Sequence, residues 1–484
     1  MLGQGSATRP AGVVRVGVGR GMFRVATRVP VAVRTRPRRF LRCLPSEIEA
    51  PPKQKLPHVD GRRQFSDVPD GRETIERVVT EAQIQNFRDT IKDELLLAPL
   101  TKGGNLPFRR LCVDFGCKVT VSEMVFARFA LKRNPVELAR LRRHESEPYF
   151  GVQIATNQIS EGVNAGRLAF ENGADFLDLN CGCPIHETWK RGLGAKLLKK
   201  PAKLERLVRG IADGIPIPLT VKIRLGAGSS EAPALALAEA VENAGAAAVV
   251  VHGRTKEQRY TRGANWDLIS DMVTDRSIPI VGNGDILTHY EHRNRVAQSN
   301  VHSTMVGRGA LIKPWIFREV VDGVEWDPTP EERIEIYLTL CGYFKDHFRS
   351  DELGLKRYLE FMPWHFGFFC RYRALPEVVY GEMAKTHPLL QTRLGIVTQT
   401  ATEQGELAEP SPLERLMRLE LEETHVALSN ALWVADGDVG KALELCVAMT
   451  TDGSLDRWED EERKLRSESR DPDGAMGGGD GIRG

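Results

Sequence analysis

Eight short runs of apolar and β-branched residues alternate with longer amphipathic stretches in the middle of the chain. The runs are Leu95–Ala98, Val119–Ser122, Phe150–Ala155, Phe176–Asn180, Leu219–Ile223, Ala248–His252, Ile278–Val281 and Ser303–Val306. Helical periodicity is clearest in residues 158–172, 195–212, 231–244 and 288–299. Alternating strands and helices predict a parallel sheet. Eight such units fit an α/β fold of the (β/α)8 TIM-barrel type, which typically has about 250 residues. An open, doubly wound sheet is the alternative, but no GxGxxG motif follows the first strand.

Composition divides the chain into six segments. They are an arginine-rich segment (1–46), a linker (47–80), the barrel (81–325), a helical region (326–400), a small helical unit (411–450) and a charged, glycine-rich tail expected to be disordered (453–484). Strand-like runs stop after Pro328, so the barrel is expected to be followed by a C-terminal helical domain.

The first segment, residues 1–46, is strongly basic. It contains ten of the 67 lysines and arginines and no acidic residue, which leaves 57 basic against 65 acidic residues in the rest of the chain. Such a segment resembles an organellar transit peptide, which indicates a mitochondrion or chloroplast, with the cytoplasm as the alternative. A basic arm that binds RNA is the other interpretation. Because the remaining chain is acidic, any surface for nucleic acid must be a local patch.

The overall composition excludes several classes of protein. Hydrophobic residues make up 41% and charged residues 27% of the chain, unlike a disordered chain or a collagen. No run approaches the ~20 apolar residues of a membrane span. The eight cysteines are scattered without a CxxC pair, which favours reduced thiols and offers no ladder of metal ligands. We therefore expect no membrane association and no metal site.

Polar residues gather where the predicted strands end, the edge at which barrels carry their reactive groups. Two glycine-rich turns, Gly282–Gly284 and Gly307–Gly309, follow the last two strands. Backbone amides in such turns, with Arg308 beside them, suit a phosphate. Turn glycines without a ligand are the alternative for either loop alone. On a middle strand, Lys222 is placed to face the electron-rich edge of a flavin.

Six motifs in order carry a family resemblance: GVQ (151–153), DLNCGCP (178–184), VKIRLG (221–226), VHGRT (251–255), GNGDI (282–286) and VGRGA (306–310). Together they resemble the tRNA-dihydrouridine synthases, FMN-dependent barrel enzymes, over roughly residues 93–375. GCPIHETWKRGLGA (182–195), HGRTKEQRYT (252–261) and WHFGFFCRY (364–372) are most similar to the eukaryotic subfamily that modifies position 47. That subfamily commonly has N-terminal CCCH zinc fingers, whereas the N-terminal region here has only Cys43.

The resemblance implies a reaction and a site. NADH or NADPH would reduce FMN, which would pass hydride to C6 of a tRNA uridine while Cys183 gives a proton to C5. A thiol near its ordinary pKa of about 8.5 can donate at neutral pH. Cys181 is expected to be structural, and a small buried hydrophobe is the alternative for Cys183. The implied cofactor residues are Pro99, Leu100, Thr101, Gln153, Lys222, His252, Asn283, Gly284, Asp285, Gly307 and Arg308.

A basic run covers residues 188–210 and begins just after Cys183. We expect tRNA contacts from Lys190, Arg191, Lys196, Lys199 and Lys203, and also from Arg254. A solvated helix face is the ordinary alternative for such a run. The helical region 326–400 is expected to extend the tRNA surface, although its aromatic run is also typical of a helical core.

Residues 411–450 resemble a ubiquitin-associated three-helix domain, which would bind ubiquitin or another protein. A helical hairpin that packs on the enzyme is the alternative. The chain is expected to be a monomer. Two other functions compete with reduction of tRNA: an FMN barrel oxidoreductase acting on a free pyrimidine, and a non-catalytic RNA-binding protein on the same scaffold.

Overall fold

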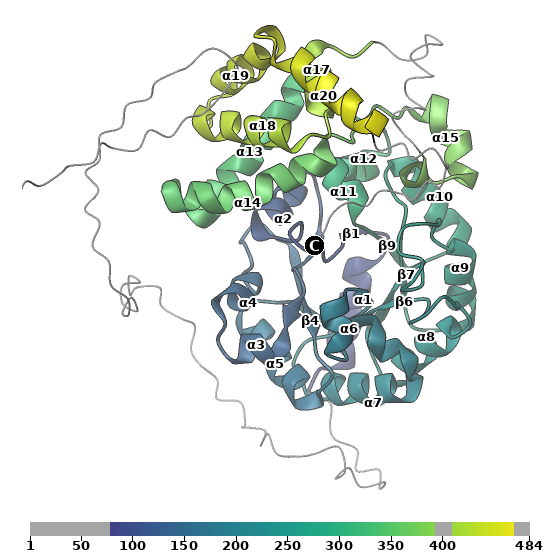
Figure 1. The fold of residues 1–484 in the computed structure, drawn as a ribbon. Coiled ribbons are helices and arrows are strands. Elements are labelled where there is room, and N and C mark those ends of the chain that lie inside the picture. The colour runs from purple at the N-terminus through teal and green to yellow at the C-terminus, as the bar shows by residue number, and fades with distance from the viewer. Residues whose placement is uncertain (1–77, 393–408, 469–484) are drawn as a thin grey trace, which may run out of the picture.

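The computed structural model describes residues 78–392 and 409–468. Within these ranges one parallel sheet contains strands β1 Leu95–Leu97, β2 Val119–Val121, β3 Val125–Phe126, β4 Tyr149–Ala155, β5 Phe176–Cys181, β6 Leu219–Arg224, β7 Ala248–His252, β8 Ile280–Asn283 and β9 Ser303–Val306. Neighbours pair in the order β1-β9-β8-β7-β6-β5-β4-β2, and the short β3 pairs with β4. Because the first strand pairs with the last, the sheet curls into a nearly closed barrel (Figure 1). The predicted TIM barrel is confirmed, and each of the eight predicted strands overlaps an observed one.

One end of the barrel interior is apolar. Successive strand residues point to opposite faces of a sheet, and the inward set includes Phe176, Val250 and Met305, which share one buried cluster. Helix α1 (Glu81–Ile91) adds Phe87, whose ring centroid lies 5.2 Å from that of Phe176. A Cβ at Gly151 would lie 2.2 Å from the Phe176 ring, so this position needs glycine. We call this cluster the barrel floor.

Helices cover the outside of the barrel (Figure 1). The principal ones are α2 Leu106–Asp114, α5 Ile159–Glu171, α7 Pro201–Ala212, α8 Ala234–Asn243, α9 Trp266–Asp275, α10 His289–Ser299 and α12 Ile316–Asp322. The predicted helix over 195–212 is instead a 3-10 helix, η1 (Gly194–Lys199), followed by α7. Pro201 causes the break, because a residue before proline is kept out of the helical region; Lys200 has φ −139° and ψ 88°.

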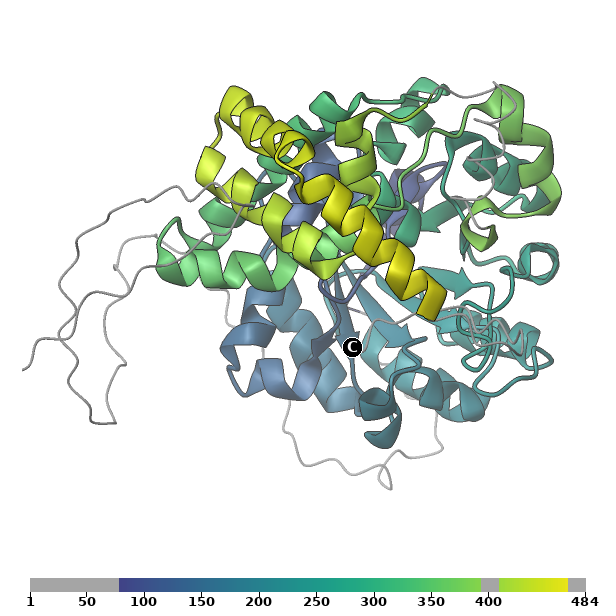
Figure 2. The ribbon, with the colours of Figure 1, turned by 45° about the horizontal axis from the view of Figure 1, so that its top comes forward.

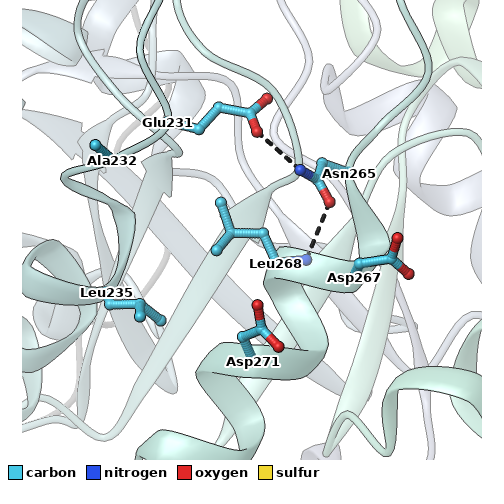
Figure 3. Close-up of a pocket in the computed structure, with 7 residues that line it drawn as sticks. All are labelled: Glu231, Ala232, Leu235, Asn265, Asp267, Leu268 and Asp271. Atoms are coloured by element: carbon cyan, nitrogen blue, oxygen red, sulfur yellow. Dashed lines mark hydrogen bonds between the residues drawn. The ribbon is translucent and has the colours of Figure 1, made fainter.

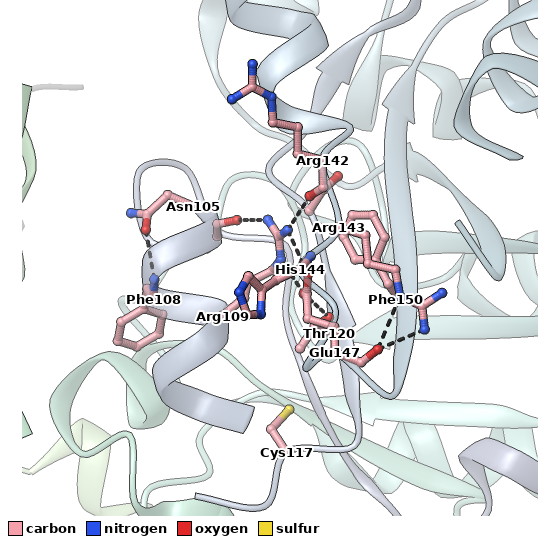
Figure 4. Close-up of polar contacts among 12 residues, drawn as sticks. Asn105, Phe108, Arg109, Cys117, Thr120, Arg142, Arg143, His144, Glu147 and Phe150 are labelled. Atoms are coloured by element: carbon pink, nitrogen blue, oxygen red, sulfur yellow. Dashed lines mark hydrogen bonds and ion pairs between the residues drawn. The ribbon is translucent and has the colours of Figure 1, made fainter. Parts of the chain in front are cut away.

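A buried ion pair fastens α2 to the chain segment that leads into β4 (Figure 4). Arg109 Nε donates to Glu147 Oε1 at 2.7 Å, and Thr120 of β2 donates to the same oxygen at 2.6 Å. Burial alone would raise the pKa of Glu147, but the charge and hydrogen bonds of Arg109 hold it below its ordinary value. Nothing in the sequence pattern predicted this pair, whose partners are far apart in the chain.

The C-terminal helices gather on one side of the barrel, next to α2 and α12 (Figures 1 and 2). They are α13 Pro330–Phe348, α14 Glu352–Phe369, α15 Glu377–Thr386, α17 Pro412–Arg418, α18 Glu422–Ala435, α19 Val439–Thr451 and α20 Ser454–Glu468. Tyr358 of α14 donates to the Ser429 carbonyl at 2.8 Å, and Arg333 of α13 forms a buried ion pair with Glu414. Residues 411–450 thus contain three helices, α17, α18 and α19, rather than a two-helix hairpin, and they pack against α13 and α14.

Part of the C-terminal tail, which was predicted to be disordered, is helical in the structure. Residues 454–468 are helical, because Leu455 and Trp458 of α20 are buried against the preceding helices. The rest of the tail, the arginine-rich segment and most of the linker lie outside the described residues. No helix within the described residues is long and apolar enough to cross a membrane.

Candidate active site

The strand ends opposite the floor carry a layer of polar side chains that face into the barrel. On β6, Val221 and Ile223 belong to the outer core, so Lys222 between them points inward. The same alternation turns Gln153, Asn180, His252 and Asn283 inward. Six of the sequence-predicted positions are thus brought to one end of the barrel, which we call the barrel mouth: Gln153, Lys222, His252, Asn283, Gly307 and Arg308.

A hydrogen-bond chain fixes the side chains at the base of this mouth. Gln153 donates through Nε2 to Asp178 at 2.7 Å and accepts from Asn180 at 2.7 Å. Thr220 donates to the other oxygen of Asp178 at 2.6 Å. Both ends of the Gln153 amide are therefore engaged within the protein, and one N–H remains for a ligand. Asp178 was not predicted as a site residue, although it stands in the DLNCGCP motif.

Lys222 is held by its neighbour across the sheet. Its ammonium donates to Asn283 Oδ1 at 2.8 Å, and Asn283 in turn donates to the Met305 carbonyl at 2.7 Å. Burial lowers the pKa of Lys222, and burial raises the pKa of Asp178. The amide of Asn283 thus aims the lysine, and a negatively charged ligand above it would restore the charged form of the ammonium.

Cys183 lies in a tightly built loop after β5 and is half-buried. Its backbone N–H donates to Asn180 Oδ1 at 2.9 Å, and its carbonyl accepts from Ala195 at 3.1 Å. Gly194 has a φ of +61°, and a Cβ there would lie 2.6 Å from the Cys183 carbonyl oxygen. Arg224 donates to the Gly182 carbonyl at 2.8 Å and supports the loop from β6.

Cys181 occupies a different environment although it is only two residues away. It is the last residue of β5, fully buried in the outer core. Burial raises the pKa of its thiol well above the ordinary value, and the nearby charge of Asp178 raises it further. Its placement is that of a small hydrophobic core residue.

An arginine cluster surrounds Asp285, which is buried and has a φ of +53°. Arg254 donates to one carboxylate oxygen at 2.5 Å, and Arg308 donates to the other at 3.0 Å. Gln391, from the segment after α15, also donates to this carboxylate at 3.2 Å. A carboxylate engaged in this way fixes the direction of Arg308. Asp285 therefore acts on the position of Arg308, and its predicted contact with a cofactor stays a prediction.

The structure does not support the predicted RNA contact of Arg254. Its side chain is fully buried, and its guanidinium donates to Asp285 and to the Arg262 carbonyl, so it is not available to RNA. Arg254 Nη1 lies 3.2 Å from His252 Nε2. Burial is the main cause that lowers the pKa of His252 well below its ordinary value, and the positive charges of Arg224 and Lys222 lower it further. A neutral imidazole is therefore expected there at neutral pH.

The end of β1 forms another wall of the mouth. Pro99 and Leu100 are partly buried, whereas Thr101 is exposed. A Cβ at Gly307 would lie 3.3 Å from the Leu100 side chain, so this loop adjoins the turn that leads into α11 (Arg308–Ile312). No side chain caps the start of α11, which leaves its first backbone amides for a ligand.

Three lysines converge on the Trp189 ring, which belongs to α6 (His186–Lys190). The ammonium nitrogens of Lys196, Lys199 and Lys256 lie 4.5, 5.1 and 4.4 Å from the ring centroid. Within the described ranges none of the three has a carboxylate at ion-pair distance. We call this group the lysine cradle; Lys256 was not predicted, and it stands in the KEQRYT stretch.

The other predicted tRNA contacts do not join the cradle. Arg191 pairs with Glu187 at 2.6 Å and lies over the Phe129 ring. Lys190 and Lys203 are exposed on α6 and α7. The basic run over 188–210 therefore has two parts: Lys190 and Lys203 are exposed to solvent, and Lys196 and Lys199 belong to the lysine cradle.

A surface pocket between α8 and α9 lies outside the barrel mouth (Figure 3). Glu231 accepts from Asn265 at 2.8 Å, and Asn265 accepts from the backbone N–H of Leu268 at 3.0 Å. Asp267 and Asp271 add further negative charge. Such a lining does not suit a phosphate group, in contrast to the mouth.

The structure is a (β/α)8 barrel whose mouth contains an inward lysine, a buried carboxylate between two arginines and a half-buried cysteine. The model of the family Dihydrouridine synthase (Dus) matches residues 96–366. The chain belongs to the dihydrouridine synthase family, as the ordered motifs predicted.

Curated relatives agree with this membership. The chain is 40% identical over 316 residues to "tRNA-dihydrouridine(47) synthase [NAD(P)(+)]-like" of Rattus norvegicus, covering 65% of this chain and 49% of the relative. It is 38% identical over 287 residues to "tRNA-dihydrouridine(47) synthase [NAD(P)(+)]" of Coprinopsis cinerea, covering 55% and 42%. The chain thus spans about half the length of the curated relatives it matches.

Proposed function

We propose that this protein binds FMN in the barrel mouth and, with NADH or NADPH as reductant, reduces a uridine of tRNA to 5,6-dihydrouridine. The observation that carries the proposal is the placement of Lys222 and Cys183 at the same strand ends. Asn180 pairs in register with Lys222, and Asn180 also anchors the Cys183 loop. The family membership and the relatives' names support the same activity.

The residues of the mouth fit FMN. Arg308, held by Asp285, and the uncapped amides at the start of α11 suit its phosphate. Lys222 suits the electron-rich edge of the ring system, and Pro99 and Leu100 offer apolar contact beside it. Bound FMN would supply the hydride, chemistry that no side chain provides.

Cys183 is the group best placed to protonate C5 of the uracil. The Asn180 and Ala195 hydrogen bonds fix its backbone, while its side chain is only half-buried. The two nearest alternatives are poorly suited: Cys181 is sealed in the core, and the neutral His252 faces Arg254. A positioned acid of this kind contributes about 10²–10⁴-fold.

The lysine cradle supports tRNA as the substrate. Ala195, which precedes Lys196 of the cradle, donates its backbone N–H to the Cys183 carbonyl at 3.1 Å, so the cradle lies beside the proposed acid. Three ammonium groups around one ring repel each other, and phosphate groups of an RNA backbone would neutralise them. Binding would then release counterions and depend steeply on salt. A free pyrimidine has no comparable charge, so the cradle favours RNA over that alternative.

The test uses the full chain, tRNA lacking dihydrouridine, and either NADH or NADPH. We expect yellow protein with about one FMN per chain and dihydrouridine formation detected by mass spectrometry. Triple replacement of Lys196, Lys199 and Lys256 by glutamine should reduce the salt dependence of tRNA affinity and leave FMN bound; Lys464→Gln, on α20, is the control. Reduction of free uracil with tRNA untouched would instead support the free-pyrimidine enzyme. Colourless protein that still binds tRNA would support the non-catalytic alternative.

Ubiquitin binding by residues 411–450, the monomeric state and the tRNA position remain predictions. Docking of α18 on α14 occupies part of that unit's surface. A pull-down with ubiquitin and a sedimentation measurement would test the first two, and mapping of the modified base would test the third.

A further inference from the structure

Three side chains from separate elements meet at the junction of the barrel and the C-terminal helices. They are His289, the first residue of α10; Glu325, between α12 and α13; and Glu377, the first residue of α15. One ligand atom from each lies within 4.8 Å of the others. The group is on the outer side of the barrel and shares no residue with the mouth.

The histidine is the unusual member of this group. Its side chain is only 3% exposed, and its Nδ1 has no hydrogen-bond partner. Its Nε2 faces the carboxylates, at 3.3 Å from Glu377 Oε2 and 3.9 Å from Glu325 Oε2.

The other oxygen of each carboxylate has a partner of its own. Arg293 pairs with Glu377 through the other carboxylate oxygen, and Glu325 Oε1 accepts from the Glu377 backbone at 3.4 Å. Both Oε2 atoms are therefore left facing the imidazole. Glu325 and Glu377 are more than a third exposed, so an ion can reach them from solvent.

The separations suit a transition-metal ion. With zinc–nitrogen and zinc–oxygen bonds of about 2.0–2.2 Å, tetrahedral ligands lie roughly 3.3–3.5 Å apart. The His289–Glu377 contact already has this spacing, whereas Glu325 Oε2, at 3.9 Å from His289 Nε2, would have to move closer on binding the ion. One imidazole and two carboxylates with an open position for water form a ligand set that Zn²⁺ accepts.

We propose that His289, Glu325 and Glu377 bind one Zn²⁺ ion, which ties α15 and the α12–α13 segment to α10 of the barrel. This departs from the expectation of no metal site, which rested on sequence spacing. The ion has no part in the proposed reaction. It would stabilise the docking of α15 and of the segment after it, which includes Gln391.

The test measures zinc directly on the full chain after treatment with a chelator and dialysis. Isothermal titration and elemental analysis should show one Zn²⁺ that depends on this group. His289→Ala should lower the affinity by more than about 100-fold, since even outer-shell partners are worth 10–100-fold. Glu325→Gln should lower it by at least about tenfold, and the exposed His387→Ala should leave it unchanged.

A second readout is independent of how well the variants fold. In the wild-type chain, Zn²⁺ should slow amide exchange in residues 377–391 and leave the barrel floor unchanged. Zinc binding that survives in both His289→Ala and Glu325→Gln would overturn the proposal. So would the absence of any zinc-dependent protection in residues 377–391.

Discussion

The two ends of the barrel interior are built from inward-facing residues of the same strands, but one end is apolar and the other is polar. At the floor, Phe176 at the beginning of β5 packs against Phe87 of α1 in an apolar cluster that needs no hydrogen-bond partners. At the mouth, Lys222 and Asn180 depend on specific hydrogen bonds to keep their direction. The comparison shows that one strand can serve stability at its beginning and chemistry at its end.

The largest expected effect separates Cys183 of the mouth from Cys181 of the outer core. Cys183→Ala should retain the fold and bound FMN but lose tRNA reduction by about 10²–10⁴-fold, because the acid is removed. Single-turnover assays with pre-reduced protein measure this step alone. Cys181→Ala is the matched control and should lose far less activity. Equal rates for Cys183→Ala and wild type would show that Cys183 is not the proton donor.

A substitution in the barrel floor should reduce stability and leave the mouth intact. Phe87→Ala is expected to lower the free energy of unfolding by about 3–5 kcal/mol, because it leaves a cavity in a dry cluster. Chemical denaturation measures the change, and Phe170→Ala, an exposed site on α5, should have little effect. The folded fraction of Phe87→Ala should keep its FMN. Release of FMN under native conditions would show that floor and mouth are coupled.

A smaller effect is expected at the arginine cluster of the mouth. Asp285→Asn keeps the shape of the side chain but removes the charge that holds Arg308 and Arg254. We expect FMN affinity to fall by about 10–100-fold, since a charge-assisted hydrogen bond contributes roughly 1.5–3 kcal/mol. Fluorescence titration of FMN gives the dissociation constant. Asp267→Asn, exposed on α9, should match the wild type; a parallel loss there would point to a general effect of charge.

The smallest effect concerns pH and the Arg109–Glu147 pair near the floor. The pKa of Glu147 is below its ordinary value in the folded protein. The pair therefore stabilises the fold at a pH above the unfolded-state value of about 4.3, and this contribution is lost as the pH falls through the lower folded-state pKa. Urea denaturation between neutral and acid pH should show a shallower acid loss for Glu147→Gln. An identical slope in both proteins would contradict the assignment.

The strands and the strand-end residues could be predicted because local periodicity and motif order determine them. Lys222 and Cys183 stand where the sequence placed them. The direction of Arg254 could not be predicted, because only the tertiary fold shows that Asp285 takes its guanidinium inward. Lys256 joins Trp189, and Glu377 meets His289, across separate elements. Such contacts leave no spacing pattern in the sequence.

Gln391 reaches from beyond α15 to the carboxylate that holds Arg308. The proposed cofactor site is thus shared between two parts of the chain that the sequence divides near residue 325. A protein ending there would keep every strand of the barrel but lose the Gln391 hydrogen bond to Asp285. If the helical domain were exchanged for another, the new domain would have to supply this contact to keep the proposed phosphate site unchanged.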